Sequence, residues 1–254
     1  MAVRGDKETI ASFSKGLRVI EAFDAGSPSL TITEVSRITG LERATARRCL
    51  LTLARDGYAD FDGKFFRLTP RVLRLGFAYL SSTPLPGIVQ PYLELLAQET
   101  NESCSTSTLD GAEIVYIARA SQRRVMSIGL AVGSRLPAYC SSMGRVLLAA
   151  RPAKECEALL SALPRTSRTP YTLTGIDELK SEIDRVRRDG FALVDQELEA
   201  GLRSIAVPLL DASGNVVAAI NVGAHADRVT VERMREEFLP RMLRVQSDLR
   251  RLLA

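Results

Sequence analysis

Two short helical patterns that meet at Gly40 limit the fold of this chain more than any other feature of its sequence. In the first pattern, TITEVSRITG, Thr31 and Glu34 have the spacing of a capping box, and Gly40 can supply the left-handed residue that ends a helix. The second pattern, LERATARRCLLTLARDG, begins at Leu41. Two short helices joined by such a turn predict a helix-turn-helix. A further helix, at 14–26, precedes them.

Helical periodicity assigns a core side and a basic side to these segments. We expect the inward-facing residues to be Leu17, Ile20, Phe23, Val35, Ile38, Ala46, Cys49, Leu50, Leu53 and Ala54. The opposite face of the last helix carries Thr45, Arg48, Thr52 and Arg55, with Arg43 and Arg47 along one flank. Taken alone, such a basic face is as typical of a solvated helix surface as of a DNA-recognition helix.

A hairpin pattern, YADFDGKFFRL, follows the helix pair. Its Asp62-Gly63 pair suits a type I′ turn, and Lys64 and Arg67 give the hairpin positive charge. The helices and hairpin in this order predict a winged helix-turn-helix. The residues expected to contact duplex DNA are Thr33, Arg43, Thr45, Arg47, Arg48, Lys64 and Arg67. Of these, Thr45, Arg47 and Arg48 would lie on the major groove, and the hairpin cations on the backbone or minor groove.

The net charge of +4 lies entirely in the first third of the chain. Residues 1–82 contain 13 Lys and Arg against 9 Asp and Glu, whereas residues 83–254 contain 21 of each. Such asymmetry favours a nucleic-acid-binding end and a neutral remainder.

We expect three regions: a DNA-binding domain at 10–69, a linker helix at 70–83 and a second domain at 84–254. The prolines of SSTPLPG end the linker pattern. Its apolar arc is wide and consists of Val72, Leu73, Leu75, Phe77, Tyr79 and Leu80. Two interpretations remain open for this arc: dimerisation, with Gly76 allowing close approach, or packing inside the DNA-binding domain.

In the second domain, the sequence predicts strands and helices that occur in separate runs along the chain. A hairpin is expected at Asp110-Gly111, a strand at 125–131 leading into a loop at 132–139, and three helices between 140 and 190. Strands at 191–195, 204–210 and 216–224 follow, and a closing helix, bent at Pro240, ends the chain. This order predicts an α+β fold with an antiparallel sheet.

Several function classes are excluded or disfavoured by composition. With 46% hydrophobic and 25% charged residues, no apolar run long enough to span a membrane and no apolar segment at the N-terminus, we expect a cytoplasmic chain without membrane contact. His225 is the only histidine and the four Cys are dispersed, so we expect neither a metal site nor a cofactor. GxSxG, Walker A, GxGxxG and HExxH motifs are missing. A hydrolase using Ser141 or Cys140 remains the enzymatic alternative.

Polar residues in the second domain could line a pocket instead. They are Arg135, Tyr139 and Ser141 around a loop, and Asp195, Arg203, Ser204 and Asn221 near strand ends. An arginine beside hydroxyl groups suits a small carboxylate, because a guanidinium can pair with it bidentately. Alternatively, Arg203 and Asp195 simply pair with each other and Asn221 caps a strand end.

These segments resemble the IclR-type transcriptional regulators over nearly the whole chain from Phe13. The resemblance rests on FSKGLRVIEAF, LTITEVSRITGLERATARRCLLTL, the hairpin and GFALVDQELEAGLRSIAVPLLDASGNVVAAINVGA. It implies a winged helix-turn-helix, a dimerising linker helix and a GAF-like effector domain that often forms tetramers. It further implies effector contacts near Gly144, Arg145, Asp195, Ser204, Asn221 and Gly223. Ala44-Thr45 departs from the Ser-Thr of many relatives, and some relatives have Cys in place of Ser204.

The stretch RRVMSIGLAVGSRLPAYCSSMGRVLLAA is most similar to the branch that controls aromatic-acid catabolism through the β-ketoadipate pathway. The hypothesis is therefore a homodimeric or homotetrameric regulator that binds a double-stranded operator and responds to a small carboxylate such as protocatechuate or β-ketoadipate. We expect that effector among Arg135, Ser141, Ser204 and Asn221. Besides the hydrolase, a constitutive architectural DNA-binding protein remains an alternative.

Overall fold

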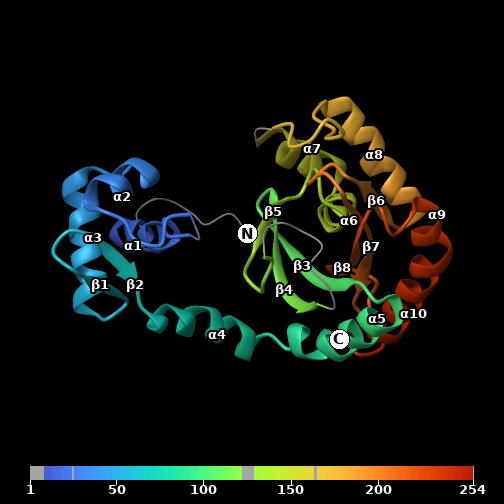
Figure 1. The fold of residues 1–254 in the computed structure, drawn as a ribbon, viewed down its shortest axis with the longest axis horizontal. Coiled ribbons are helices and arrows are strands. Elements are labelled where there is room, and N and C mark those ends of the chain that lie inside the picture. Colours follow the sequence, from blue (N-terminus) through green and yellow to red (C-terminus); the bar gives the residue numbers. More distant parts are fainter. Residues whose placement is uncertain (1–8, 25, 122–128, 163–164, 254) are drawn as a thin grey trace. The chain divides into compact units, whose positions relative to one another are not determined.

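The computed structural model describes residues 9–24, 26–121, 129–162 and 165–253 (Figure 1). The chain divides into two compact units, Met1–Ser81 and Ser82–Ala254, which are described separately. In the described part of the chain, no helix is both long and apolar enough to cross a membrane.

The described part of the N-terminal unit begins with three helices and a two-stranded sheet: α1 (Ala11–Glu21), α2 (Ile32–Thr39), α3 (Arg43–Arg55), β1 (Ala59–Phe61) and β2 (Phe66–Leu68). The predicted helix-turn-helix and wing are confirmed in this order. The capping box of α2 is also confirmed, because the Thr31 hydroxyl accepts from the Glu34 N–H while the Glu34 carboxylate accepts from the Thr31 N–H. Gly40 ends the helix with φ 67°.

The core of this unit is narrower than the periodicity predicts. Val19, Val35, Ala46, Leu50 and Phe66 are fully buried. Leu17 and Ile38, both expected to face inward, are instead 40% and 44% exposed. Three short helices and a hairpin cover only one stripe of each helix, so the apolar residues that flank the stripe remain exposed.

The wing turn is longer than the Asp62-Gly63 pair predicts. Phe61 pairs with Phe66, so four residues connect the strands. Asp62 does not have the positive φ of a type I′ turn, and only Gly63 does, at 102°. The Asp62 carboxylate accepts from the N–H groups of Lys64 and Phe65, which stabilises the longer loop and lowers the pKa of Asp62.

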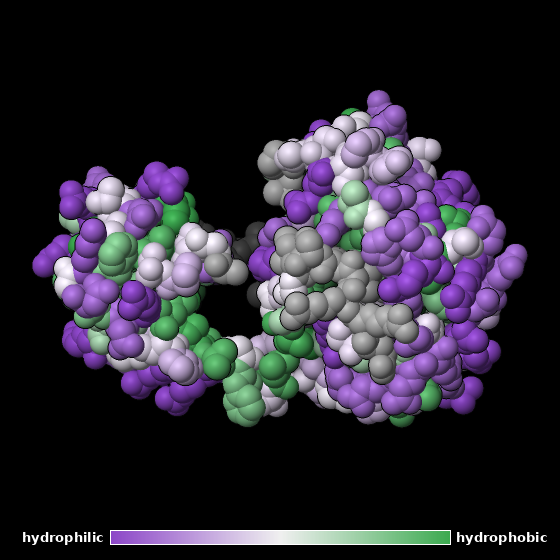
Figure 2. Space-filling model, in the orientation of Figure 1, coloured by the Kyte–Doolittle hydropathy of each residue, from purple (hydrophilic) through white to green (hydrophobic). Residues whose placement is uncertain are grey.

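The N-terminal unit ends in a short 3-10 turn, Pro70–Val72, and in α4 (Leu73–Ser82), which buries none of its residues. Figure 2 shows hydrophobic residues gathered along this helix. The large apolar side chains that it exposes are Leu73, Leu75, Phe77, Tyr79 and Leu80.

The C-terminal unit is built on an antiparallel sheet with strand order β5-β4-β3-β8-β7-β6. The strands are β3 (Ser103–Asp110), β4 (Glu113–Ala120), β5 (Arg135–Pro137), β6 (Ala192–Asp195), β7 (Leu202–Leu210) and β8 (Val216–His225). The α+β prediction is confirmed. β5 lies where a loop was expected, and most of the strand expected at 125–131 lies outside the described residues.

Helices cover both faces of this sheet. α5 (Leu85–Thr100) and α10 (Leu239–Arg250) pack on one face, and α6 (Ser142–Ala149), α7 (Ala153–Ala162) and α8 (Ile176–Asp189) pack on the other (Figure 1). Along β7, Ile205 and Val207 face α5 and α10, whereas Ala206 faces α6, as alternation requires. The closing helix is interrupted before Pro240: α9 (Val231–Arg233) is followed by a π-helical turn at Met234–Phe238.

A bulge in β4 changes which side chains share a face of the sheet. Ser107 pairs with Tyr116, but Thr106 pairs with Ala118 and Ser105 with Arg119, so Ile117 is the extra residue. Tyr116 and Arg119 therefore lie on the same face although they are an odd number of positions apart. This face is the one that α6 covers.

Candidate nucleic-acid interface and ligand cavity

The exposed face of α3 carries three arginines that pair with no carboxylate in the described part of the chain. Within the described residues, Arg43, Arg47 and Arg48 form no ion pair, and Arg48 contacts only the Thr45 hydroxyl, at 3.5 Å. Thr52 uses its hydroxyl inside the helix, donating to the Arg48 carbonyl at 2.9 Å. Free guanidinium groups on a helix of this kind can pair with phosphate oxygens or with the O6 and N7 atoms of guanine.

The remaining residues expected at DNA are exposed but differ in their partners. Lys64 lies 5.1 Å from the centre of the Phe65 ring, and Arg67 lies 3.8 Å from an Asp62 carboxylate oxygen. Thr33 is exposed in the first turn of α2. DNA contact by each of these residues stays a prediction.

A small cavity lies between the sheet and the N-terminus of α6. Its volume is about 30 Å³. Its described lining consists of Ser103, Tyr116, Arg119, Leu130, Ser141, Ser142, Met143, Leu198, Leu202, Ser204, Asn221 and Gly223. Gly223 pairs with Ser103 on one side and with Ser204 on the other, so these three positions lie side by side across the sheet.

Three polar side chains of this cavity lack a carboxylate or a hydrogen-bond partner among the described residues. The Arg119 guanidinium donates to the Ser105 hydroxyl at 2.8 Å and meets no carboxylate among the described residues. Asn221 Oδ1 and Ser142 Oγ are buried without any hydrogen-bond partner in the described part of the chain. Because buried polar groups are normally paired, these atoms indicate a site for a polar ligand.

The cavity favours an anionic ligand. Ser141 caps α6 by accepting from the Gly144 N–H at 3.3 Å, and the N-terminus of a helix carries partial positive charge. Burial raises the pKa of Tyr116 to about 12, so its phenol stays neutral and adds no negative charge. Arg119 then supplies the formal charge for pairing with a carboxylate.

Sequence reasoning missed Arg119 because the bulge at Ile117 reverses the alternation of β4. Counting by two from Ile114 and Tyr116 places Arg119 on the opposite face. The bulge depends on the pairing of β4 with β3, and no sequence pattern within β4 indicates it.

Arg135 does not lie on this cavity, contrary to the prediction. It stands on β5 at the edge of the sheet, where it pairs with Asp110 and Glu113, each at 2.8 Å. These two carboxylates flank the β3–β4 turn, beside which β5 pairs with β4. The hairpin thus neutralises the arginine that the sequence assigns to the ligand.

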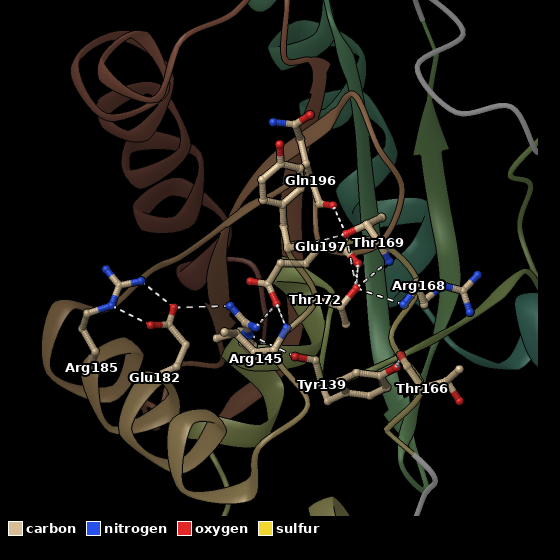
Figure 3. Close-up of polar contacts among 12 residues, drawn as sticks. Tyr139, Arg145, Thr166, Arg168, Thr169, Thr172, Glu182, Arg185, Gln196 and Glu197 are labelled. Carbon is tan, nitrogen blue, oxygen red and sulfur yellow. Dashed lines mark hydrogen bonds and ion pairs between the residues drawn. The ribbon is translucent and has the colours of Figure 1, made fainter.

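Arg145 and Gly144, expected at the effector, lie behind the cavity wall. Arg145 is 1% exposed, donates to Glu197 at 2.6 Å and to the Tyr139 carbonyl at 3.0 Å, and lies 3.4 Å from Glu182 (Figure 3). Gly144 packs so tightly on Ala138 that a Cβ atom would overlap its backbone. Both residues therefore hold α6 in place.

Tyr139, Asp195 and Arg203 are likewise engaged elsewhere. The Tyr139 hydroxyl donates to the Thr166 carbonyl at 2.6 Å. Arg203 and Asp195 form a bidentate pair with both distances at 2.8 Å, which confirms the alternative that they pair with each other. Of the ten residues expected at the effector, the cavity brings together Ser141, Ser204, Asn221 and Gly223.

The described residues show no catalytic pair around Ser141 or Cys140. Burial raises the pKa of the Cys140 thiol to about 11, which disfavours a thiolate. His225 is 3.4 Å from Asp227 and does not line the cavity. No group of three His, Cys, Asp or Glu residues in the described ranges could hold a metal ion.

Two family models match the chain. A model described as "IclR helix-turn-helix domain" matches residues 12–63, and one described as "Bacterial transcriptional regulator IclR C-terminal" matches residues 77–250. Together they cover both units.

Similar curated proteins are regulators. The chain is 47% identical over 249 residues to the Pca regulon regulatory protein of Pseudomonas putida, covering 98% of this chain and 86% of that protein. It is 37% identical to the p-hydroxybenzoate hydroxylase transcriptional activator of Acinetobacter baylyi, covering 97% of this chain and 93% of that one.

Similar solved structures have the same architecture. A putative transcriptional regulator from Rhodococcus sp. RHA1 superposes with a TM-score of 0.81 at 47% identity, covering 96% of this chain and 98% of that one. An IclR homolog from Microbacterium hydrocarbonoxydans, complexed with 4-hydroxybenzoate, superposes with a TM-score of 0.77 at 25% identity, covering 95% and 100%.

Proposed function

The chain belongs to the IclR family of bacterial transcriptional regulators, and we propose that it controls genes of aromatic-acid catabolism in response to a small aromatic carboxylate. DNA binding through the helix-turn-helix and small-molecule binding through the C-terminal unit follow from the family. The pca and p-hydroxybenzoate regulators among its relatives, and the homolog complexed with 4-hydroxybenzoate, support an aromatic carboxylate as the class of effector.

The observation that carries the effector class is Arg119, with its charge unneutralised among the described residues, beside the unpaired Asn221 Oδ1 and Ser142 Oγ. In this proposal, the effector carboxylate pairs with Arg119. Ring hydroxyl groups of the effector donate to Asn221 and exchange hydrogen bonds with the serines of the cavity, Ser141, Ser142 and Ser204.

The size of the cavity supplies a physical basis for regulation. A volume of about 30 Å³ holds only about two water molecules, so an aromatic ring requires a wider conformation. The effector would therefore bind the wide conformation more tightly than the narrow one. Such differential affinity is what a ligand needs in order to shift a conformational equilibrium.

On DNA, Thr45, Arg47 and Arg48 of α3 contact base edges or phosphates of the major groove. Arg43 and Thr33 lie beside them in this proposal, and Lys64 and Arg67 of the wing contact the backbone or the minor groove. The exposure of the four arginines, Lys64 and Thr33 and the positive charge of residues 1–82 support this assignment, and Thr45 is half-buried beside Arg48. Because a bacterial transcriptional regulator meets its operator in the cytoplasm, we propose the cytoplasm as the location of this protein. Each neutralised phosphate releases counterions, so operator affinity should fall steeply with salt.

A second copy of this chain is the partner proposed for α4 and the adjoining face of α1. A groove of about 720 Å³ there includes Ile10, Phe13 and Leu75, which are 72%, 67% and 47% exposed. Exposed apolar surface of this kind is typical of a protein interface. A dimer would require two half-sites separated by about one or more helical turns, and a tetramer would pair two such dimers.

The decisive experiment measures binding of the wild-type protein to promoter fragments by fluorescence anisotropy at low ionic strength. It is repeated with protocatechuate, 4-hydroxybenzoate and β-ketoadipate. We expect tight binding to a fragment near its own gene and a change in affinity with one of these acids. Failure to bind any such fragment, with or without acid, overturns the proposal.

Two controls separate the rival functions. An architectural DNA-binding protein would bind promoter fragments without any response to acids and would show no ligand-induced rise in melting temperature, whereas a specific effector stabilises the folded state by mass action. A hydrolase would cleave aryl esters in an activity screen, and we expect no turnover.

A further inference from the structure

A second hollow borders the effector cavity. It is an open groove of about 680 Å³ on the surface of the C-terminal unit. Two described residues, Leu130 and Leu198, line both the groove and the cavity. Leu198 is only 7% exposed, so its side chain fills part of the partition between the two hollows. A ligand that moved from the groove into the cavity would have to displace it.

The two sides of the groove have different structures. One side is the edge of the sheet, with Arg135, Leu136 and Pro137 of β5. The other side consists of residues 168–170 and 198–200. The charged residues of the groove are two arginines, Arg135 and Arg168, and two glutamates, Glu113 and Glu199, so its described lining has no net charge and Arg119 remains the cation that pairs with the carboxylate.

Residues 168–173 and 196–198 are joined into a single segment by hydrogen bonds. Thr169 donates to the Gln196 carbonyl at 2.7 Å, Thr172 to the Glu197 carbonyl at 2.6 Å and Arg168 to the Leu198 carbonyl at 3.2 Å (Figure 3). The Leu173 N–H also donates to the Glu197 carboxylate, at 3.0 Å. These bonds would remain intact if the two segments moved together. We call these two segments, residues 168–173 and 196–198, the flap.

The flap is tied to the opposite cavity wall by a buried charge pair. Glu197 of the flap accepts from Arg145 of α6 at 2.6 Å, and the first residues of that helix line the cavity. Arg145 also donates to the Tyr139 carbonyl, which fixes the guanidinium on the α6 side. Outward movement of the flap therefore breaks the Arg145–Glu197 contact while its internal bonds survive.

A charge pair is well suited to an anchor that must release. Burial of two charges costs desolvation energy that nearly cancels their attraction, and the separated charges regain hydration when the flap opens. Glu182, 3.4 Å from Arg145, stays behind on α8 and continues to offset the charge of the guanidinium.

We propose that the groove is the entrance of the effector cavity, and that Leu198 is its gate, held closed by the Arg145–Glu197 pair. The proposal assigns Arg145 and Glu197 a positioning role, without contact to the effector. It rests on the proposed function, because the cavity is taken as the effector site.

The test uses a thiol introduced inside the cavity by Ser204→Cys in the full-length protein. Its rate of modification by methyl methanethiosulfonate, followed by mass spectrometry to separate it from the native cysteines, measures how often the cavity opens. We expect Leu198→Ala and Glu197→Gln, each added to this background, to accelerate modification by about tenfold, since both favour the open state.

Two matched controls accompany these variants. Leu253 lines neither the cavity nor the groove and is 6% exposed, so Leu253→Ala removes a similar buried leucine without touching the partition. Asp195→Asn weakens another charge pair of the unit, the one with Arg203, which does not line the cavity. Both controls should leave the modification rate within about twofold of the background.

The outcomes decide the two parts of the proposal separately. If Leu198→Ala reacts no faster than Leu253→Ala, the groove is not the entrance. If Glu197→Gln reacts no faster than Asp195→Asn, or if it fails to fold while Leu198→Ala and Leu253→Ala react alike, the anchored gate is rejected. The assay needs no effector, so a failure of every acid to bind would overturn the proposed function and leave this measurement intact.

Discussion

Arginines in the two units of this protein have different neighbours. On α3 of the N-terminal unit, Arg43, Arg47 and Arg48 form no ion pair within the described residues. In the C-terminal unit, Arg135, Arg145 and Arg203 are each neutralised by carboxylates. Arg119 differs from those three, since only the Ser105 hydroxyl meets its guanidinium in the described structure.

The comparison teaches that an arginine available for a ligand is identified by the carboxylate it lacks. Residues 1–82 contain 13 basic against 9 acidic residues, so many of their cations have no internal partner. Residues 83–254 contain 21 of each, and the described arginines there that form no ion pair include exposed ones such as Arg188 and Arg250. Arg119 differs from these because it is partly buried and lines the cavity. The following experiments can break or sharpen this contrast.

The largest effect is expected from Arg47→Ala combined with Arg48→Ala. Loss of two groove contacts should weaken operator binding by about 2–6 kcal/mol and lower its salt dependence. Fluorescence anisotropy at several salt concentrations measures both. Arg250→Ala with Arg251→Ala removes the same charge from exposed positions of the other unit and should change binding little. Equal losses in the two double variants would mean that net charge alone carries DNA binding.

Replacement of the cavity arginine should have the next largest effect. Arg119→Gln removes a charge-assisted contact to the effector carboxylate, worth about 1.5–3 kcal/mol, so calorimetry with protocatechuate should show roughly 10- to 100-fold weaker binding. Arg135→Gln serves as the matched variant, because Arg135 is already neutralised by Asp110 and Glu113. A larger loss for Arg135→Gln would return the effector to the place that the sequence first indicated.

A smaller effect should separate folding from DNA contact inside the N-terminal unit. Thr31→Ala removes the cap of α2 and should cost about 1 kcal/mol of unfolding free energy, which denaturant titration measures. Thr33→Ala, two residues further and exposed, should leave stability unchanged and weaken operator binding slightly. Identical behaviour of the two variants would contradict the assignment of Thr33 to the DNA surface.

The smallest effect concerns pH in the C-terminal unit. Burial alone would raise the pKa of Glu182, but the hydrogen bond from Arg185 and the charge of Arg145 lower it below its ordinary 4.5. The ionised carboxylate therefore stabilises the folded unit above about pH 4.5, and this stabilisation is lost as the pH falls through the lowered value. Glu182→Gln should flatten the loss of stability in that range by at most about 1 kcal/mol. Thermal melts at several pH values between roughly 3 and 6 measure this. The melting temperature would change with pH equally in the wild type and in Glu182→Gln if the carboxylate did not stabilise the fold.

Short-range rules predicted the N-terminal unit well. The Thr31–Glu34 cap and the Gly40 stop depend on residues three to nine positions apart, and both are present. The wing turn was wrong in length because the Asp62 carboxylate bonds to Lys64 and Phe65, an arrangement that competes with a two-residue turn. Leu17 and Ile38 were misplaced because periodicity does not tell how much of a helix its neighbours cover.

The ligand cavity was only partly predictable, since long-range contacts decide it. Ser141, Ser204, Asn221 and Gly223 were found because they stand at the ends of recognisable elements or match the family pattern. Arg145 and Glu197 are 52 positions apart, and Arg135 pairs with residues 22 and 25 positions away. No local sequence pattern indicates partners so far apart in the chain. An arginine that is paired with a carboxylate could therefore not be distinguished, from the sequence, from one that is available to bind a ligand.

The bulge at Ile117 has a consequence for how such regulators diversify. If β4 paired regularly with Ile117 kept in place, Ile117 would lie opposite Thr106 and Ala118 opposite Ser105, and Arg119 would turn toward α5, away from the cavity. Deletion of Ile117, by contrast, would leave Arg119 opposite Ser105 and on the cavity face. Effector preference in this architecture can thus depend on whether the bulge forms, with every cavity side chain kept in identity, and the presence of the bulge should be compared across relatives as closely as substitutions are.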